Sequence, residues 1–256
     1  MATIAVPRRG RSVGRFYVGM AWLFVAIAFG GFFETYWYQL ARGTFVRGTP
    51  MLHLHGLMFS AWTLFFLSQA TLVANGKLRS HKDWGLLGIA LATAMVFTGF
   101  GVAIEGLHSR LAMGQGDSAR AFVLVPVTAI LLFAGFVAAA IVNVRRPEWH
   151  KRFMLVATAA LLGAAIARIV FVAVTGGGPG LRPGLGATPP PFMTVTASLV
   201  ALLPVVAAMI NDWRRSGRVH PAYSWGFAIC LSVHLLRPMI GETATWLRFT
   251  DFLLAF

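Results

Sequence analysis

Long apolar segments alternate with short polar ones along the whole chain. A helix rises about 1.5 Å per residue, so about 20 apolar residues cross the roughly 30 Å hydrocarbon core of a bilayer. Seven segments approach or exceed that length, at residues 16–33, 52–74, 86–107, 122–144, 153–174, 192–210 and 223–240. The pattern predicts an all-α, polytopic transmembrane bundle of about seven helices. The last segment fits least well, because it contains His234, Arg237 and Pro238.

Composition favours the same class of protein. Hydrophobic residues make up 57% of the 256 positions and charged residues 12%, whereas soluble domains carry about 25% charged residues. We therefore expect residues 1–256 to form a single integral membrane domain.

Three segments lie outside the predicted spans. Residues 1–15 are basic, and because no small-residue cleavage site ends the first span, we expect an uncleaved anchor. The Gly- and Pro-rich segment 175–191 cannot continue a helix, so it is a flexible connector, which we favour, or a cap over the bundle. Residues 245–256 are predicted to form an interfacial amphipathic tail.

Basic residues are distributed unevenly between the two predicted sides. With the amino terminus inside and the carboxyl terminus outside, fourteen of the 22 Lys and Arg residues lie on the cytoplasmic side and seven on the outer side. The cytoplasmic set is Arg8, Arg9, Arg11, Arg15, Lys77, Arg79, Lys82, Arg145, Arg146, Lys151, Arg152, Arg214, Arg215 and Arg218; the outer set is Arg42, Arg47, Arg110, Arg120, Arg182, Arg237 and Arg248.

Because Lys and Arg near span ends favour the cytoplasmic side, this bias predicts the orientation, in a bacterial cytoplasmic (inner) membrane. The net charge of +14 is then a topology signal and an attraction to anionic headgroups. The lipid bilayer is the expected partner, and no nucleic-acid partner is expected.

The predicted topology sorts the histidines by depth. His81, His150 and His220 are 69 and 70 residues apart, and each precedes a span that runs outward, which indicates three related helical hairpins. An outer group comprises His53, His55 and His234, and His108 follows the third span.

Neutral imidazole is a common ligand of haem iron, zinc and copper. A b-type haem in a helical bundle needs two histidines from different helices at similar depth. His81 and His150 meet this condition on parallel helices, and His55 with His234 forms a corresponding outer pair. We prefer His55 to His53 because Gly56, next to His55, allows a flat cofactor to approach. The sequence predicts one or two haem b groups, with copper or zinc as alternative metals.

A plainer interpretation stays open for these histidines. A histidine at the membrane interface is also simply a polar residue in a wet layer, and a buried one such as His234 also serves structural hydrogen bonding. Ionisable residues in mid-membrane are nevertheless costly and are usually functional.

Arg168 lies deep within the fifth predicted span, where an unpaired charge costs several kcal/mol. We expect it to face Glu105 or an anionic ligand such as a haem propionate; the alternative is that it extends to the outer interface. Cys230 is the only cysteine, so no disulfide forms within the chain.

Three short stretches resemble a bacterial family of multi-span membrane proteins of unknown function. In EWHKRFMLVATAALLGAAIARIV (148–170) the family pattern is H-R-x-x-M at a helix start with a later Arg, and Lys151 replaces the usual Arg. HGLMFSAWTLFFLSQATL (55–72) and SHKDWGLLG (80–88) resemble its H-x-x-x-(small)…Q and H-R-x-x-G patterns. The matched positions are His55, Gln69, His81, Gly85, His150, Lys151, Met154 and Arg168.

The resemblance covers about half of the chain, spans two to five, and that family has no settled activity. Its layout is distantly similar to ascorbate-reducible transmembrane b-type cytochromes, which hold two haems between alternate helices. This chain departs from that layout, since its fourth span has no histidine, so an outer haem would have to recruit His234.

From these observations we expect a membrane-embedded, histidine-ligated haem b or metal protein. It would transfer electrons between a quinone or outer donor and a larger membrane complex, or assist cofactor assembly of a respiratory enzyme. The alternatives are a cofactor-free accessory subunit of a larger complex and a small-solute transporter that uses Arg168 and His234. No residue is assigned a catalytic role, and the sequence leaves open whether the chain is an enzyme.

Overall fold

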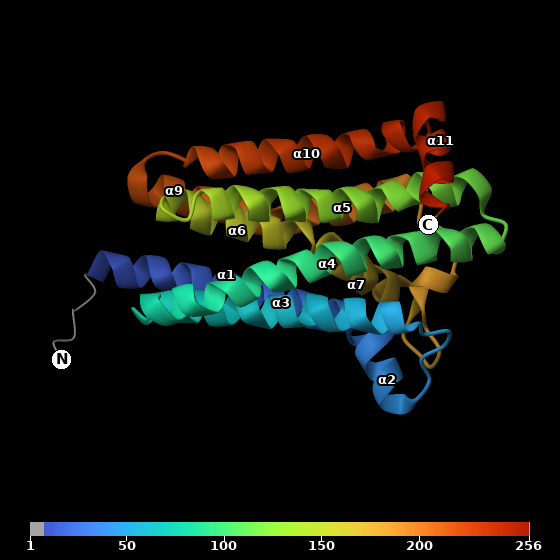
Figure 1. The fold of residues 1–256 in the computed structure, drawn as a ribbon, viewed down its shortest axis with the longest axis horizontal. Coiled ribbons are helices and arrows are strands. Elements are labelled where there is room, and N and C mark those ends of the chain that lie inside the picture. The colour runs from blue at the N-terminus through green and yellow to red at the C-terminus, as the bar shows by residue number, and fades with distance from the viewer. Residues whose placement is uncertain (1–7, 256) are drawn as a thin grey trace.

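The computed structural model describes residues 8–255, and it is 83% helical with no strand among those residues (Figure 1). The basic segment 1–15 lies outside the description as far as residue 7, and helix begins at Arg8. The helices are α1 (Arg8–Phe32), α2 (Tyr38–Arg42), α3 (Pro50–Ala74), α4 (Leu78–Ala112), α5 (Gly116–Val142), α6 (Pro147–Ala160), α7 (Gly163–Thr175), α8 (Pro191–Ala201), α9 (Leu203–Ser216), α10 (Pro221–Gly241) and α11 (Ala244–Leu253).

Six helical stretches are long and apolar enough to cross a membrane, which supports a multi-pass helical membrane protein. They are Gly14–Arg42, Pro50–Ala74, Leu78–Ala112, Gly116–Val142, Pro147–Thr175 and Pro191–Ser216. The seventh segment expected from the sequence forms α10, 21 residues long, which runs beside the others (Figure 1). Averaged along its length, α10 is less apolar than these six stretches require, and it is not counted among them.

Two of these stretches contain a short break. The helix is interrupted at Leu161 and Leu162, between α6 and α7, and again at Leu202, between α8 and α9. The second break has a local cause in Pro204, which has no N–H to donate and whose ring clashes with the carbonyl four residues earlier. In the first stretch of the chain, a π-helical turn (Phe33–Trp37) separates α1 from α2.

The stretch formed by α6 and α7 is the central one. Of its 18 most apolar consecutive residues, 50% are buried, a larger share than in any other of the six stretches. Small residues allow its neighbours to approach closely: a Cβ on Gly31 of α1 would lie 2.4 Å from the Ala165 carbonyl oxygen, and one on Gly226 of α10 would lie 3.0 Å from Val156. Such small-residue contacts are the usual basis of helix packing in membranes.

The loops gather at two ends of the bundle (Figure 1). We call one the basic end, where α1 begins and where loops 75–77, 143–146 and 217–220 lie. We call the other the capped end, where loops 43–49, 113–115 and 176–190 lie. α1 begins at the basic end and α10 ends at the capped end.

The Gly- and Pro-rich segment is fixed to the capped end. Gln39, only 1% exposed, donates to the Gly178 carbonyl (2.7 Å) and accepts from the Gly180 N–H (2.8 Å). Arg110 donates to the Gly186 carbonyl at 2.9 Å. The segment is therefore a cap rather than the flexible connector that we favoured, because buried side chains of α2 and α4 satisfy its backbone groups.

The predicted tail forms α11, which lies across the capped end of the bundle (Figure 1). Trp246 donates through Nε1 to the Arg120 carbonyl at 2.8 Å, and Arg120 pairs with Asp251. Phe249 and Phe252 are exposed, so the helix presents an apolar edge, as an interfacial segment does.

Candidate functional site

The first turn of α6 carries most of the polar chemistry at the basic end. Pro147 begins the helix, as proline often does at a first helical position. Glu148 then accepts from Lys151 (2.6 Å) and from Arg152 (2.5 Å), one turn later on the same helix face. His150 lies between them, on the side of α6 that faces α4 and α5.

His81 and His150 come together at this end. His81 lies in the first turn of α4 and His150 in the first turn of α6, and their ring centres are 6.2 Å apart with an interplanar angle of 74°. Both helices begin at the basic end, so they run parallel, as the sequence predicted. α5 runs the opposite way and packs against both.

The hydrogen bond of His150 determines which ring nitrogen is free. Its Nδ1 lies 2.9 Å from the Ala140 carbonyl oxygen. A carbonyl only accepts, so Nδ1 carries the hydrogen, and in the neutral ring Nε2 has an unprotonated lone pair. This second hydrogen bond to a carbonyl is the usual arrangement of a metal-ligating histidine. For His81, Nδ1 is buried and has no partner in the described part of the chain.

The ring separation and the donor set together fit haem. Two imidazoles on opposite sides of one metal ion, each with a metal–nitrogen distance of about 2 Å, have ring centres roughly 6 Å apart. Among the described residues, no group of three or more His, Cys, Asp or Glu side chains is placed to hold a metal. A structural zinc site takes four protein ligands, whereas haem brings four nitrogens and needs only axial ligands from the protein.

Gly85 leaves open space beside this pair. It lies one turn after His81 on the same face of α4, and a Cβ built on it would meet nothing within 4 Å. A side chain there would fill this space, so the glycine leaves room for a flat group next to His81.

His220 belongs to the same end but has another task. Its Nδ1 accepts from the Ala222 N–H at 3.2 Å, which caps α10, and its ring lies 4.8 Å from that of Trp149. Burial, and after it the charge of Arg152, lowers the pKa of His220 below its ordinary value of 6.5. The ring is therefore neutral with its hydrogen on Nε2. Nδ1 is already used as an acceptor and Nε2 carries the hydrogen, so neither nitrogen of His220 is free to bind a metal.

An ion pair between α6 and α9 supports the site, and the sequence did not indicate it. Arg152 binds Asp212 through two hydrogen bonds of 2.8 Å, and both side chains are less than a tenth exposed. Arg152 also lies over the ring of Tyr223, whose hydroxyl is 3.0 Å from that of Tyr17. α1, α6, α9 and α10 thus meet within two residues of His150.

The expected outer pair, His55 and His234, is not brought together. α3 and α10 lie along opposite edges of the bundle (Figure 1). The ring centre of His55 lies 4.1 Å from that of Phe59, while His234 lies one turn before Arg237 on α10. Nδ1 of each histidine is buried without a described partner. The two histidines were paired on their expected depth along the membrane, but depth alone does not determine which helices are neighbours.

Arg168 forms no ion pair with Glu105 within the described residues, and its other expected partner, an anionic ligand, stays a prediction. It donates to the Ala164 carbonyl (3.0 Å) and lies 4.3 Å from the centre of the Phe32 ring, while Glu105 accepts from Thr49 at 2.7 Å. Arg168 lines a groove of about 220 Å³ between α1 and α7, together with Glu34.

Arg237 is another buried arginine, which was counted from the sequence as an outer-side charge and as a weak point of the seventh segment. Arg237 is 6% exposed; its Nε donates to Thr128 of α5 (2.6 Å) and its Nη1 to Ser198 of α8 (3.1 Å). One guanidinium nitrogen, Nη2, is buried without a described partner. Arg237 therefore ties α10 to α5 and α8, a role that a weakly apolar seventh segment did not reveal.

Against known proteins, no family model, no curated protein and no solved structure matches this chain.

Proposed function

We propose that this chain is an electron-transfer protein of a bacterial cytoplasmic membrane that holds one haem b between His81 and His150. α10 is its seventh span, and the basic end faces the cytoplasm. The single observation that carries the proposal is the 6.2 Å separation of the two imidazoles at the start of parallel helices.

Haem, when bound, supplies a one-electron couple between ferric and ferrous iron. The residues of the chain supply the rest. The Ala140 carbonyl keeps the hydrogen of His150 on Nδ1, so that Nε2 is available to iron. The Arg152–Asp212 pair fixes the first turn of α6, and with it the direction of the His150 ring. Because a Cβ on Gly85 would meet no atom within 4 Å, the glycine would leave room beside His81 for the edge of a flat macrocycle.

A haem at this depth lies near the cytoplasmic surface of the membrane. A quinone in the same bilayer and a larger membrane complex are the partners of suitable chemistry, one on either side of the electron transfer. The same site also serves if the chain delivers haem to a respiratory enzyme during its assembly. One haem is proposed rather than two, because the outer histidines have separate surroundings.

Haem content per chain tests the proposal. We expect the purified protein to contain about one haem b, and His81→Ala and His150→Ala each to lose it, since axial ligation holds the iron. His108→Ala, an exposed histidine near the capped end of α4, is the matched control and should retain it. His220→Asn, which keeps a capping side chain, should retain it as well.

Two results would contradict the proposal. Equal haem content in His81→Ala and the wild type would remove His81 as a ligand. A colourless wild type from haem-replete cells, without copper or zinc by elemental analysis, would favour a cofactor-free accessory subunit.

A further inference from the structure

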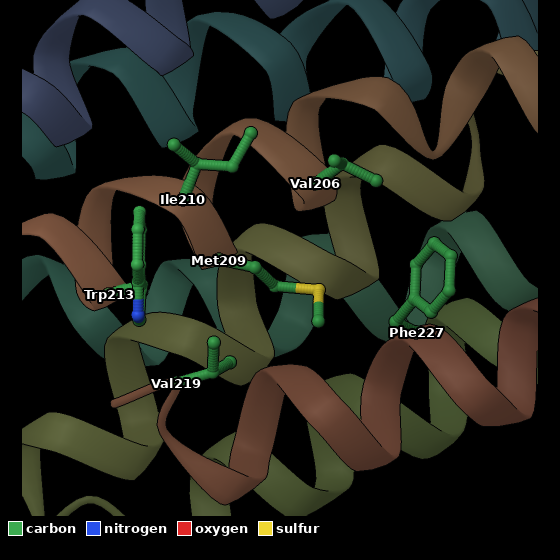
Figure 2. A pocket seen from close by; sticks show the side chains of 6 residues that line it. All are labelled: Val206, Met209, Ile210, Trp213, Val219 and Phe227. Carbon is green, nitrogen blue, oxygen red and sulfur yellow. The ribbon is translucent and has the colours of Figure 1, made fainter. Parts of the chain in front are cut away.

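An apolar groove of about 380 Å³ lies between α9 and α10 near the basic end (Figure 2). Val206, Met209, Ile210 and Trp213 line it from α9, Val219 from the following loop and Phe227 from α10. The four α9 residues follow a spacing of three and four, so they form one stripe about 10 Å long. Ile210 and Trp213 are 44% and 60% exposed, so the groove opens to the surroundings of the bundle.

Two arginines are next in the chain to residues that line this groove near the basic end. Arg214 follows Trp213, and Arg218 precedes Val219. Both side chains are exposed, and within residues 8–255 neither guanidinium has an ion pair. The nearest acid in the sequence, Asp212, is already paired with the buried Arg152. The mouth of the groove therefore keeps its positive charge.

We propose that this groove is a binding site for an anionic phospholipid such as phosphatidylglycerol. One acyl chain lies along the α9 stripe, and the phosphate lies between Arg214 and Arg218. An apolar groove alone would accept any lipid chain. The unneutralised arginines at its mouth select the charge of the headgroup, because a juxtamembrane basic residue attracts anionic lipid by an amount equivalent to about a fivefold preference each.

Fluorescence quenching by bromine-labelled lipid tests this site, because Trp213 lies in the groove. The protein is reconstituted in phosphatidylcholine vesicles that contain a small fraction of brominated phosphatidylglycerol or of brominated phosphatidylcholine with the same acyl chains. The signal of Trp213 is the difference between wild type and Trp213→Phe. We expect the anionic lipid to quench this signal with an apparent affinity at least about fivefold higher than the neutral lipid.

Paired variants separate headgroup recognition from general lipid contact. Arg214→Gln with Arg218→Gln should abolish the preference without reducing quenching by the neutral lipid. Arg145→Gln with Arg146→Gln, which removes the same charge from the α5–α6 loop, should leave it intact. Equal quenching by both lipids in the wild type would overturn the proposal. Absence of quenching by either lipid would also overturn it, and would indicate that a second copy of the chain covers the groove.

Discussion

Arg152 shows how far the environment of a residue departs from its place in the sequence. Its position just after a loop of two arginines marks it as one of many cytoplasmic charges. In the structure its side chain is only 9% exposed. It is paired with Asp212, which lies 60 residues away on another helix. Local sequence pattern does not reveal a partner that only the packing of α6 on α9 supplies.

Asp212→Asn should destabilise the protein by about 3–5 kcal/mol, because it leaves the buried Arg152 without its counter-charge. The midpoint of thermal unfolding in detergent measures this change. Asp83→Asn is the control: Asp83 pairs with Arg79 at 3.9 Å on the exposed surface, where such pairs contribute at most about 1 kcal/mol. Equal midpoints for the two variants would show that the buried pair adds no stability.

Gly85→Leu should lower haem content to less than half without loss of folded protein. The new side chain meets no protein atom within 4 Å of its Cβ, but it fills the space beside His81. Gly106→Leu on the same helix also enters open space, far from the pair, and should keep its haem. Full haem content in Gly85→Leu would place the macrocycle elsewhere.

At the level of the helices, the lengths of the apolar segments predicted where most of the helices lie. Each predicted span corresponds to a helical stretch, since the apolar length that a bilayer requires is a strong signal. The two breaks, at residues 161–162 and at 202, were not predicted. The α8–α9 break has a visible cause in Pro204, whereas the α6–α7 break arises within an apolar run that carries no such signal.

Which helices are neighbours decides which histidines can form a pair. His81 and His150 were predicted together because both begin parallel helices, and the structure places them side by side. His55 and His234 were predicted to share a depth, but they belong to α3 and α10, which lie at opposite edges of the bundle (Figure 1). The order of helices around a bundle depends on contacts that no single span encodes.

Gln39→Ala should release the Gly- and Pro-rich segment from the capped end. The Gly180 N–H then loses its acceptor, and its hydrogen exchange should become about tenfold faster, as expected for a hydrogen bond worth about 1–1.5 kcal/mol. Arg42→Gln should leave the exchange unchanged, because within residues 8–255 the Arg42 side chain bonds only to Tyr38 of the same helix. Unchanged exchange in Gln39→Ala would show that other contacts hold the segment.

At the scale of the whole molecule, charge and apolar length together determine topology. Because α1 begins at the basic end and α10 ends at the capped end, an amino terminus inside requires the carboxyl terminus outside. A reporter that is active only outside the cytoplasm should give no signal when fused after Arg215, and should be active when fused near Gly180. An active fusion after Arg215 would reverse the orientation and place the His81–His150 pair at the outer surface.

The visible spectrum of the purified wild-type protein tests whether His81 and His150 ligate one haem iron. We expect a coloured preparation with a Soret band that shifts on reduction and the sharp α band of low-spin, six-coordinate haem b. A high-spin, five-coordinate spectrum would contradict a bis-histidine site, and a colourless protein from haem-replete cells would contradict the assignment of haem altogether.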